Sequence, residues 1–208
     1  RQRQMCIETD HIRTNHPADV IALHNFENGY CGISQIEESK YCLCYLTTAR
    51  NLQQHSNNIA QLEQQVLAQN PHLKTILSNA ERLYSAPVAI SQISFDRKTQ
   101  VEHQLLLLGD AAGMITPLCG NGMSMALHGS KLAFECMDAF LQGRLSRAAM
   151  EQQYQQLWQQ QFARRLYTGR MIQRFFGRSW LTNLFVQTFR AFPPLAGPLI
   201  RQTHGKPF

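Results

Sequence analysis

The sequence predicts a mixed α/β (α+β) fold in which an antiparallel sheet precedes a strand–loop–helix unit and a helical tail. Three observations predict it: strand-like runs separated by turn residues in the first hundred positions, a run of four leucines followed by a glycine-rich stretch, and apolar residues at helical spacing beyond that stretch. At 208 residues and 44% hydrophobic, the chain can bury a core of its own as one or two domains.

The first hundred residues contain the sheet. Strand-like sequence begins close to the amino end, and three further runs are separated by turn residues, at 20–26, 30–36 and 41–48. Runs joined by such short turns are typical of an antiparallel meander. Two short helices are expected at 59–69 and 72–80, separated at Pro71, and an extended segment at 87–95 leads towards the leucines.

The segment 105–130, LLLLGDAAGMITPLCGNGMSMALHGS, is the most informative part of the chain. Its four leucines predict a strand buried on both faces, as in the middle of a parallel sheet. Gly109 and Asp110 end that strand, a loop follows, and apolar spacing predicts a helix from about Asn121 to Gly143. A carboxylate at the end of a buried strand, beside a helix N-terminus, is where α/β folds bind nucleotides.

Each part of this segment has a chemical use. Asp110 could accept hydrogen bonds from sugar or polyol hydroxyls, and the small residues after it let a ligand approach the backbone: Ala111, Ala112 and Gly113. Pro117 stiffens the loop, while Gly120 and Gly122 free the backbone to point amide groups at an acceptor, reinforced by the helix dipole. The spacing alone is equally compatible with an ordinary strand–turn–helix corner that carries an aspartate by chance.

The stretch GDAAGMITPLCGNGMSMAL (109–127) resembles the second FAD motif of flavoproteins with the p-hydroxybenzoate-hydroxylase fold. That motif runs GDAA, a short spacer, Pro, two residues, Gly, one residue, Gly, and then a helix rich in small residues. Gly113 stands where the aromatic hydroxylases commonly have His. A Gly there is similar to the geranylgeranyl-reductase-like and electron-transfer-flavoprotein-dehydrogenase-like branch.

The resemblance implies an FAD cofactor whose ribityl chain is bound by Asp110. The backbone from Pro117 through Met123 would face the pyrimidine edge of the isoalloxazine, and the helix dipole would stabilise negative charge on the reduced ring. The implied cofactor-binding residues are Gly109, Asp110, Ala111, Gly113, Pro117, Gly120, Asn121, Gly122 and Met123. NAD(P)H or another donor would supply electrons, no metal is expected, and no residue is assigned a catalytic role.

Three regions are expected along the chain. The resemblance implies that residues 1–100 form the antiparallel substrate-domain sheet with two short helices, and 101–143 the carboxyl-terminal part of a Rossmann-like FAD-binding domain; the third region, the basic aromatic helical tail at 144–208, is predicted from the sequence pattern itself. The GxGxxG motif that holds the ADP half of FAD in that family occurs nowhere in this chain, and no βαβ unit precedes GDAA. We therefore expect the carboxyl-terminal portion of a longer flavoprotein, without its amino-terminal FAD-binding segment.

One stretch departs from the family pattern. Residues 29–32, Gly-Tyr-Cys-Gly, occupy the place where members often carry Gly-Tyr-aromatic-hydrophobic-Pro, and both the second aromatic and the proline are missing. The tryptophan-rich signature of flavin halogenases is also absent, which counts against a halogenase.

The tail is strongly basic. Residues 1–143 carry 10 Lys and Arg against 13 Asp and Glu, whereas 144–208 carry 10 against Glu151 alone. Apolar spacing predicts helices at about 148–176 and 180–191. Three interpretations compete: a packed helical pair with a solvated arginine face, which we favour; peripheral contact with an anionic membrane or a lipid-like substrate; and nucleic acid, which no recognition motif supports.

The remaining signals concern location and reactive groups. No apolar stretch of about 18 residues is present, and the six cysteines show neither CxxC nor zinc spacing, so we expect a cytoplasmic protein with peripheral membrane contact as an option. Cys42 and Cys44 would share one strand face as small core residues. Cys119 in the loop is expected to be structural, with a redox or gating role beside the isoalloxazine as the alternative. His128 on the following helix could face solvent or sheet.

These observations predict an FAD-dependent oxidoreductase, reductase- or dehydrogenase-like, acting on a small apolar substrate such as an isoprenoid or lipid. Two alternatives stay open: a flavin-dependent monooxygenase, and a non-catalytic module that cannot hold FAD alone. No Ser/His/Asp arrangement, HExxH or Walker motif indicates another enzyme class.

Overall fold

The computed structural model describes residues 5–176 and 178–204. The chain divides into two compact units. Unit 1 comprises Arg1–Ser94 and Phe175–Gln187, and unit 2 comprises Phe95–Arg174 and Thr188–Phe208. Each unit therefore combines segments that are distant in the sequence, and each is described by itself.

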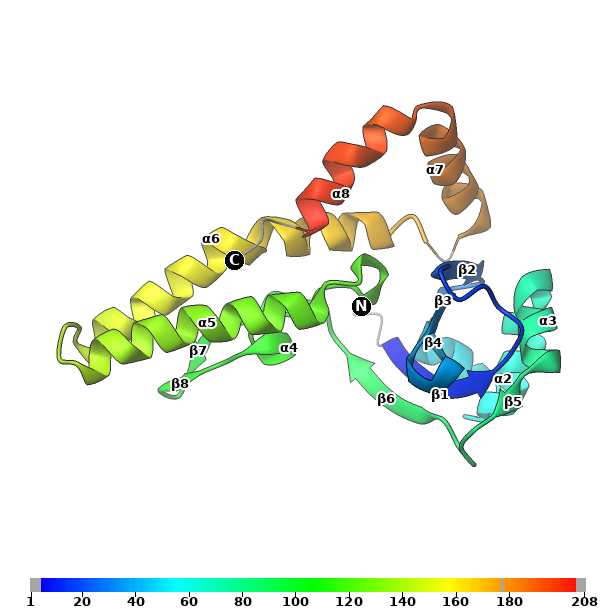
Figure 1. Cartoon of the computed structure of the whole chain (residues 1–208), viewed down its shortest axis with the longest axis horizontal. Coiled ribbons are helices and arrows are strands. Elements are labelled where there is room, and N and C mark those ends of the chain that lie inside the picture. Colours follow the sequence, from blue (N-terminus) through cyan, green and yellow to red (C-terminus); the bar gives the residue numbers. More distant parts are fainter. Residues whose placement is uncertain (1–4, 177, 205–208) are drawn as a thin grey trace. The chain divides into compact units, whose positions relative to one another are not determined.

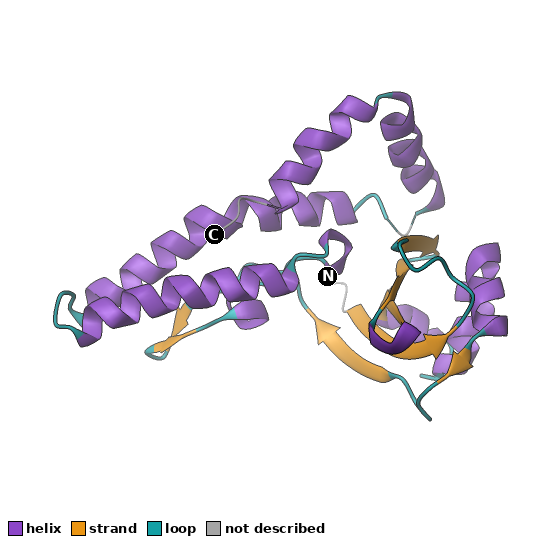
Figure 2. Cartoon of the chain, in the orientation of Figure 1, coloured by secondary structure: helices purple, strands orange, loops and turns teal. Residues whose placement is uncertain are grey.

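Unit 1 is built on an antiparallel sheet with strand order β2-β3-β4-β1-β5, in which β6 also pairs with β1 (Figures 1 and 2). The strands are β1 Met5–Arg13, β2 Ala22–Phe26, β3 Gly29–Gln35, β4 Tyr41–Thr48, β5 Glu81–Arg82 and β6 Val88–Ile93. The predicted antiparallel meander is confirmed as β2-β3-β4. The chain then places β1 beside β4, a pairing of distant segments that local sequence does not encode.

A tight turn joins β2 to β3. Asn28 adopts a left-handed conformation with φ +59°, which Asn tolerates better than most residues. At Gly29 a Cβ atom would lie 2.3 Å from the Phe26 ring, so only glycine fits there. Gly29 is therefore needed by the turn and its packing.

Three short helices follow the meander: α1 Ala49–Gln54, α2 Ile59–Gln65 and α3 Pro71–Asn79. Asn58 and Asn70 cap α2 and α3 by accepting hydrogen bonds from backbone amides in the first turn. Both helices were predicted, although Pro71 opens α3 instead of preceding it, since its missing N–H is not needed in a first turn. The capped turn α1 was not predicted.

The sheet buries one face against α2 and α3. Tyr41, Leu43 and Tyr45 of β4 point into that core together with apolar residues of both helices. Cys42 and Cys44 alternate with them and share the opposite face, as expected, but they are only half-buried, so the expectation that they belong to the core is wrong. The Thr9 hydroxyl donates to Cys44 Sγ. The side chain of Cys6 lies outside the described residues.

Unit 2 is organised by a hairpin of two long helices, α5 Gly122–Leu141 and α6 Arg147–Gln173 (Figure 1). Trp158, Phe162 and Leu166 of α6 are buried in its core against Leu132 and Cys136 of α5. Both predicted long helices are confirmed. The helix α7 Ser179–Ala191 also matches its predicted range, whereas α8 Ala196–His204 was not expected. None of the helices in the described residues is long and apolar enough to cross a membrane.

The leucine run differs most from its prediction. Only Leu105 and Leu106 form a strand, β8, which pairs antiparallel with β7 Val101–Glu102. We expected a strand buried on both faces in the middle of a parallel sheet, and this is wrong for the described residues. There β8 pairs with β7 alone, in a two-stranded antiparallel sheet. Leu105 is 64% exposed and Leu108 42% exposed. His103 and Gln104 both have positive φ, as a two-residue hairpin turn requires.

Candidate functional site

The GDAA sequence forms a single helical turn, α4 Gly109–Ala112, where a loop was expected. Gly109 has φ +53°, a conformation that favours glycine, and a Cβ there would lie 3.5 Å from Cβ of Ala126 on α5. Asp110 is exposed, and its backbone carbonyl accepts a hydrogen bond from Lys98 Nζ at 2.8 Å. The turn thus presents the residue carrying the expected ribityl-binding carboxylate to solvent, next to α5.

The small residues after Asp110 serve two purposes. Ala111 is exposed, in keeping with close approach of a ligand, but Ala112 and Gly113 are buried. A Cβ on Gly113 would lie 2.5 Å from the Trp158 ring. Ala112 and Gly113 are therefore less open than expected: neither is exposed to solvent, the space beside Gly113 is occupied by Trp158, and both residues line an internal cavity of unit 2.

The glycine loop (residues 117–122) borders empty space, whereas the space beside Gly113 is occupied by Trp158. Pro117 begins a short 3₁₀ turn, and Gly120 is left-handed with φ +64°. A Cβ on Gly120 or on Gly122 would meet no heavy atom within 4 Å. Met123, in the first turn of α5, is 84% exposed. The backbone of this loop is therefore accessible to a ligand.

The first turn of α5 has amides available for an acceptor. The side chain of the N-cap residue Asn121 does not cap the helix, and its Nδ2 donates instead to the backbone carbonyl of Thr203 on α8 at 3.0 Å. The first amides of a helix have no acceptor within the helix, and its dipole places partial positive charge there. The pyrimidine edge of a flavin offers carbonyl oxygens and ring nitrogens, so the open loop fits that group chemically.

Cys119 and His128 are packing residues in this unit. Cys119 Sγ lies 3.3 Å from the position a Cβ would take on Gly169 of α6, and burial raises the pKa of its thiol to about 11. A thiol so held is protonated at neutral pH, which supports the structural role. His128 is buried with its ring edge-to-face on Phe162 at 5.2 Å, so it faces α6 and neither solvent nor a sheet. Burial, followed by the charges of Arg165 and Lys131, lowers its pKa.

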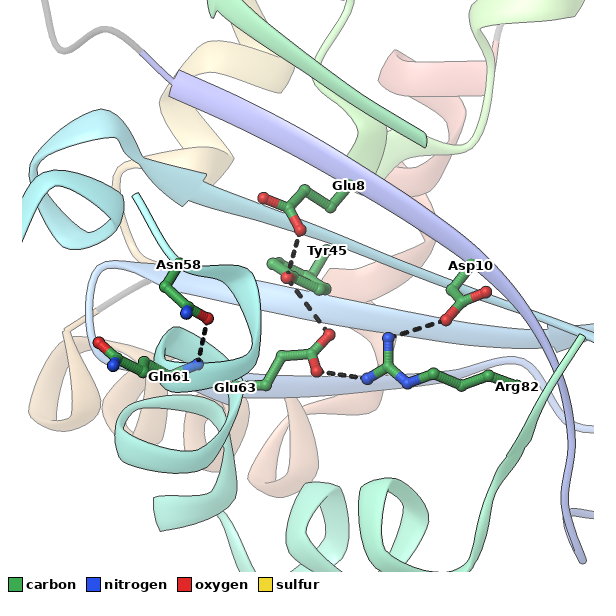
Figure 3. Close-up of polar contacts among 7 residues, drawn as sticks. All are labelled: Glu8, Asp10, Tyr45, Asn58, Gln61, Glu63 and Arg82. Atoms are coloured by element: carbon green, nitrogen blue, oxygen red, sulfur yellow. Dashed lines mark hydrogen bonds and ion pairs between the residues drawn. The ribbon is translucent and has the colours of Figure 1, made fainter. Parts of the chain in front are cut away.

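A second group of polar residues lies in unit 1 and was missed in the sequence. This polar cluster consists of Glu8, Asp10, Tyr45, Glu63 and Arg82, which come from β1, β4, α2 and β5 (Figure 3). Tyr45 Oη donates to Glu8 Oε2 at 2.6 Å and lies 3.4 Å from Glu63 Oε1. Arg82 bridges Asp10, at 3.0 Å, and Glu63.

Burial perturbs the acids of the polar cluster. It raises the pKa of Glu8 and of Glu63, with Tyr45 and Arg82 respectively opposing the shift. One signal in the sequence could have revealed the cluster. Glu8 and Asp10 stand two residues apart, on one face of a strand whose next residue on that face is the buried Ile12. Their partners are distant in the chain, so the bonds themselves could not be predicted.

Comparison with known proteins gives one curated relative, and no protein-family model matches the chain. Conditioned medium factor receptor 1 from Dictyostelium discoideum is 29% identical over 179 residues. The match covers 84% of this chain and 32% of that receptor, so the chain spans about a third of the relative's length.

Solved structures with a similar fold are flavin-dependent enzymes. The flavin-dependent brominase Bmp2 is 18% identical with a TM-score of 0.74, over 97% of this chain and 50% of that one. A flavoprotein/dehydrogenase from Cytophaga hutchinsonii is 14% identical with a TM-score of 0.63, over 80% of this chain and 42% of that one. PqsL of Pseudomonas aeruginosa, described as a probable FAD-dependent monooxygenase, is 12% identical with a TM-score of 0.56, over 86% of this chain and 50% of that one.

These similarities establish a mixed α/β fold that corresponds to about half of a flavin-dependent enzyme. Enzymes described as a brominase, a dehydrogenase and a monooxygenase share it, so the fold does not separate these activities. The similarity to Bmp2 shows that a flavin-dependent brominase shares this fold, although the chain has no tryptophan-rich signature.

Proposed function

We propose that this chain is part of an FAD-dependent oxidoreductase of the reductase or dehydrogenase type, acting on an apolar substrate such as an isoprenoid or lipid. One observation carries the proposal. The open glycine loop leads into α5 beside the exposed Asp110, in a fold that flavin-dependent enzymes share. When bound, FAD would supply the hydride- or electron-transfer chemistry, and the chain would bind and orient it.

The proposed roles divide along the segment. Asp110 would accept hydrogen bonds from the ribityl hydroxyls. The amides of Gly120, Gly122 and Met123 would face the pyrimidine edge at the positive end of the α5 dipole. We assign no nicotinamide site among the described residues, so the proposal names FAD alone.

Gly113 supports the reductase- and dehydrogenase-like branch by a packing argument. The Trp158 ring occupies the space that any side chain on residue 113 would need. A chain with Trp158 in this place cannot hold the His that commonly follows GDAA in aromatic hydroxylases. Monooxygenase chemistry is the nearest alternative, since PqsL shares the fold.

Flavin binding by the purified chain tests the proposal. We expect the chain to take up added FAD, seen as a shifted visible spectrum and quenched flavin fluorescence. Asp110→Ala should weaken FAD binding by roughly 10- to 100-fold, the loss expected for hydrogen bonds to a charged acceptor. Asp19→Ala removes an exposed carboxylate from unit 1 and should leave binding unchanged.

Two results would count against it. Equal FAD affinity in Asp110→Ala and in Asp19→Ala would refute the ribityl assignment. A chain that does not bind FAD at all would favour the non-catalytic module. That module is the second candidate because the chain spans 50% of Bmp2 and 42% of the Cytophaga hutchinsonii flavoprotein/dehydrogenase.

The tail carries a separate proposal of peripheral membrane contact. In the part of the tail that belongs to unit 1, Trp180 is 65% exposed, and the exposed Arg178 lies two residues before it. Aromatic and basic side chains together suit the surface of an anionic membrane. Flotation with anionic vesicles should recover the chain at low salt and less of it at high salt. Absence from the floating fraction at low salt would rule out the contact.

A further inference from the structure

Unit 2 contains a cavity that the flavin proposal does not use. Its volume is about 210 Å³, and it lies between the segment 96–100, the end of α4 and the helix α6. Arg97, Lys98 and Arg170 line it together with Asp96. Trp158 forms part of its wall. We refer to this space as the basic cavity.

Hydrogen bonds hold the walls of the basic cavity in place. Gln100 is 3% exposed, and its Nε2 donates to the carbonyls of Lys98, at 2.8 Å, and Ala112, at 3.0 Å. Its Oε1 accepts a hydrogen bond from Gln159 Nε2 of α6 at 3.2 Å. Arg170 Nη1 donates to the Phe95 carbonyl at 3.2 Å. The segment 96–100 is therefore fixed against α6, and the cavity is formed before any ligand arrives.

The charges around the basic cavity do not cancel. Three cationic side chains face one carboxylate, that of Asp96. Burial lowers the pKa of Arg170, and the charge of Arg97 lowers it further, whereas Asp96 opposes the shift. The neighbouring Arg174 adds to the repulsion. A cluster of cations with this imbalance gains most from an anion placed between them.

The wall of the cavity strengthens such an interaction. Trp158 is 4% exposed and lines the cavity, so it presents an apolar ring to the bound group. Charges interact more strongly beside a wall of low polarity than in bulk water. At roughly 30 Å³ per water molecule, the volume corresponds to about seven waters, which is enough for a phosphate group and part of what it is attached to.

We propose that the basic cavity binds a phosphate oxyanion through Arg97, Lys98 and Arg170. Guanidinium groups match phosphate oxygens with paired hydrogen bonds, and lysine adds a compact charge. Gln159, whose Nε2 also donates to Gln100, lines the cavity with a neutral amide. The cavity is not lined by the glycine loop, but Lys98 also donates to the backbone carbonyl of Asp110, so the phosphate and flavin proposals need separate tests. The phosphate could belong to a free ion or to a nucleotide, and these sources have the same chemistry.

Fluorescence of Trp158 tests the site on the full chain. Trp180→Phe leaves Trp158 as the one tryptophan, and this background is titrated with inorganic phosphate, with ADP and with acetate at low salt. We expect saturable changes with phosphate or ADP at concentrations where acetate has no effect. Tighter binding of ADP would identify a nucleotide phosphate, and equal or tighter binding of inorganic phosphate a free ion.

Charge-matched variants decide whether the cavity is the site. Arg97→Gln should weaken phosphate binding at least tenfold, since it removes charge-assisted hydrogen bonds. Arg164→Gln removes the same charge from an exposed position on α6 and should leave binding unchanged. Equal affinity in both variants, equal weakening in both, or no saturable response to phosphate or ADP would each overturn the proposal. Binding of riboflavin, which has the isoalloxazine and ribityl chain of FAD but no phosphate, reports on the glycine loop independently in the same variants.

Discussion

The polar cluster of unit 1 and the glycine loop of unit 2 satisfy their polar groups in opposite ways. In the cluster, buried carboxylates are bonded to Tyr45 and Arg82 within the chain, and only single oxygens of Glu8 and Asp10 lack a hydrogen-bond partner among the described residues. In the loop, Gly120 and Gly122 border open space. The first region stabilises the fold, whereas the second is left to be completed by a ligand. In this chain the carboxyl groups with shifted pKa values, Glu8 and Glu63, belong to a structural cluster, whereas the candidate site is marked by the accessible backbone of the glycine loop.

Removing the cation of the polar cluster should have the largest effect. Arg82→Met leaves Asp10 and Glu63 buried without their counter-charge, since their side chains are 5% and 7% exposed. Arg82 itself is 39% exposed, so we expect a loss of about 2 kcal/mol in the free energy of unfolding at pH 7, below the range for fully buried pairs. Urea denaturation measures it. Arg13→Met breaks the exposed pair with Glu81 and should change little. Equal losses in both variants would mean that the cluster does not stabilise unit 1.

Alanine substitutions at Gly113 and Gly122 should distinguish the packed turn after GDAA from the open glycine loop. Gly113→Ala places a methyl group 2.5 Å from the Trp158 ring, and the overpacking should cost about 1–3 kcal/mol. Gly122→Ala enters open space at the start of α5 and should leave the stability unchanged. Urea denaturation of both variants, followed by near-ultraviolet circular dichroism, tests the difference. Full stability of Gly113→Ala would contradict the packing role assigned to that glycine.

The smallest effect concerns pH. Burial raises the pKa of Glu8 above its ordinary value of 4.5, so the folded chain holds this proton more tightly than the unfolded chain. The contribution of Glu8 to the stability is then fully present below pH 4.5 and is lost as pH rises from there through the folded pKa. Glu8→Gln should make that decline shallower, and Glu27→Gln, at an exposed position, should not. Parallel pH profiles for Glu8→Gln and the unmodified chain would show that Glu8 does not carry the effect.

Sequence patterns correctly predicted the elements that form through interactions between residues close in the sequence. The helices α5 and α6 carry long apolar repeats, and the β2-β3-β4 meander has short turns, so each was visible in the sequence. The leucine run failed because an apolar run specifies burial but supplies no partner strand. The expectation of open backbone at Gly113 failed for a similar reason, since Trp158, which packs beside it, is 45 residues later in the sequence. The polar cluster joins four elements and could not be predicted from any of them.

The way the two units share the chain limits how the molecule can be divided. Segment 175–187 belongs to unit 1, although 80 residues of unit 2 precede it. Within unit 1 Phe176 lies edge-to-face on Tyr30 of β3 and also contacts Phe185 of α7. Truncation of the chain after residue 174 would therefore remove aromatic packing from a sheet whose strands all lie in residues 5–93. Neither unit can be exchanged between proteins by one crossover, because two separated segments encode each of them.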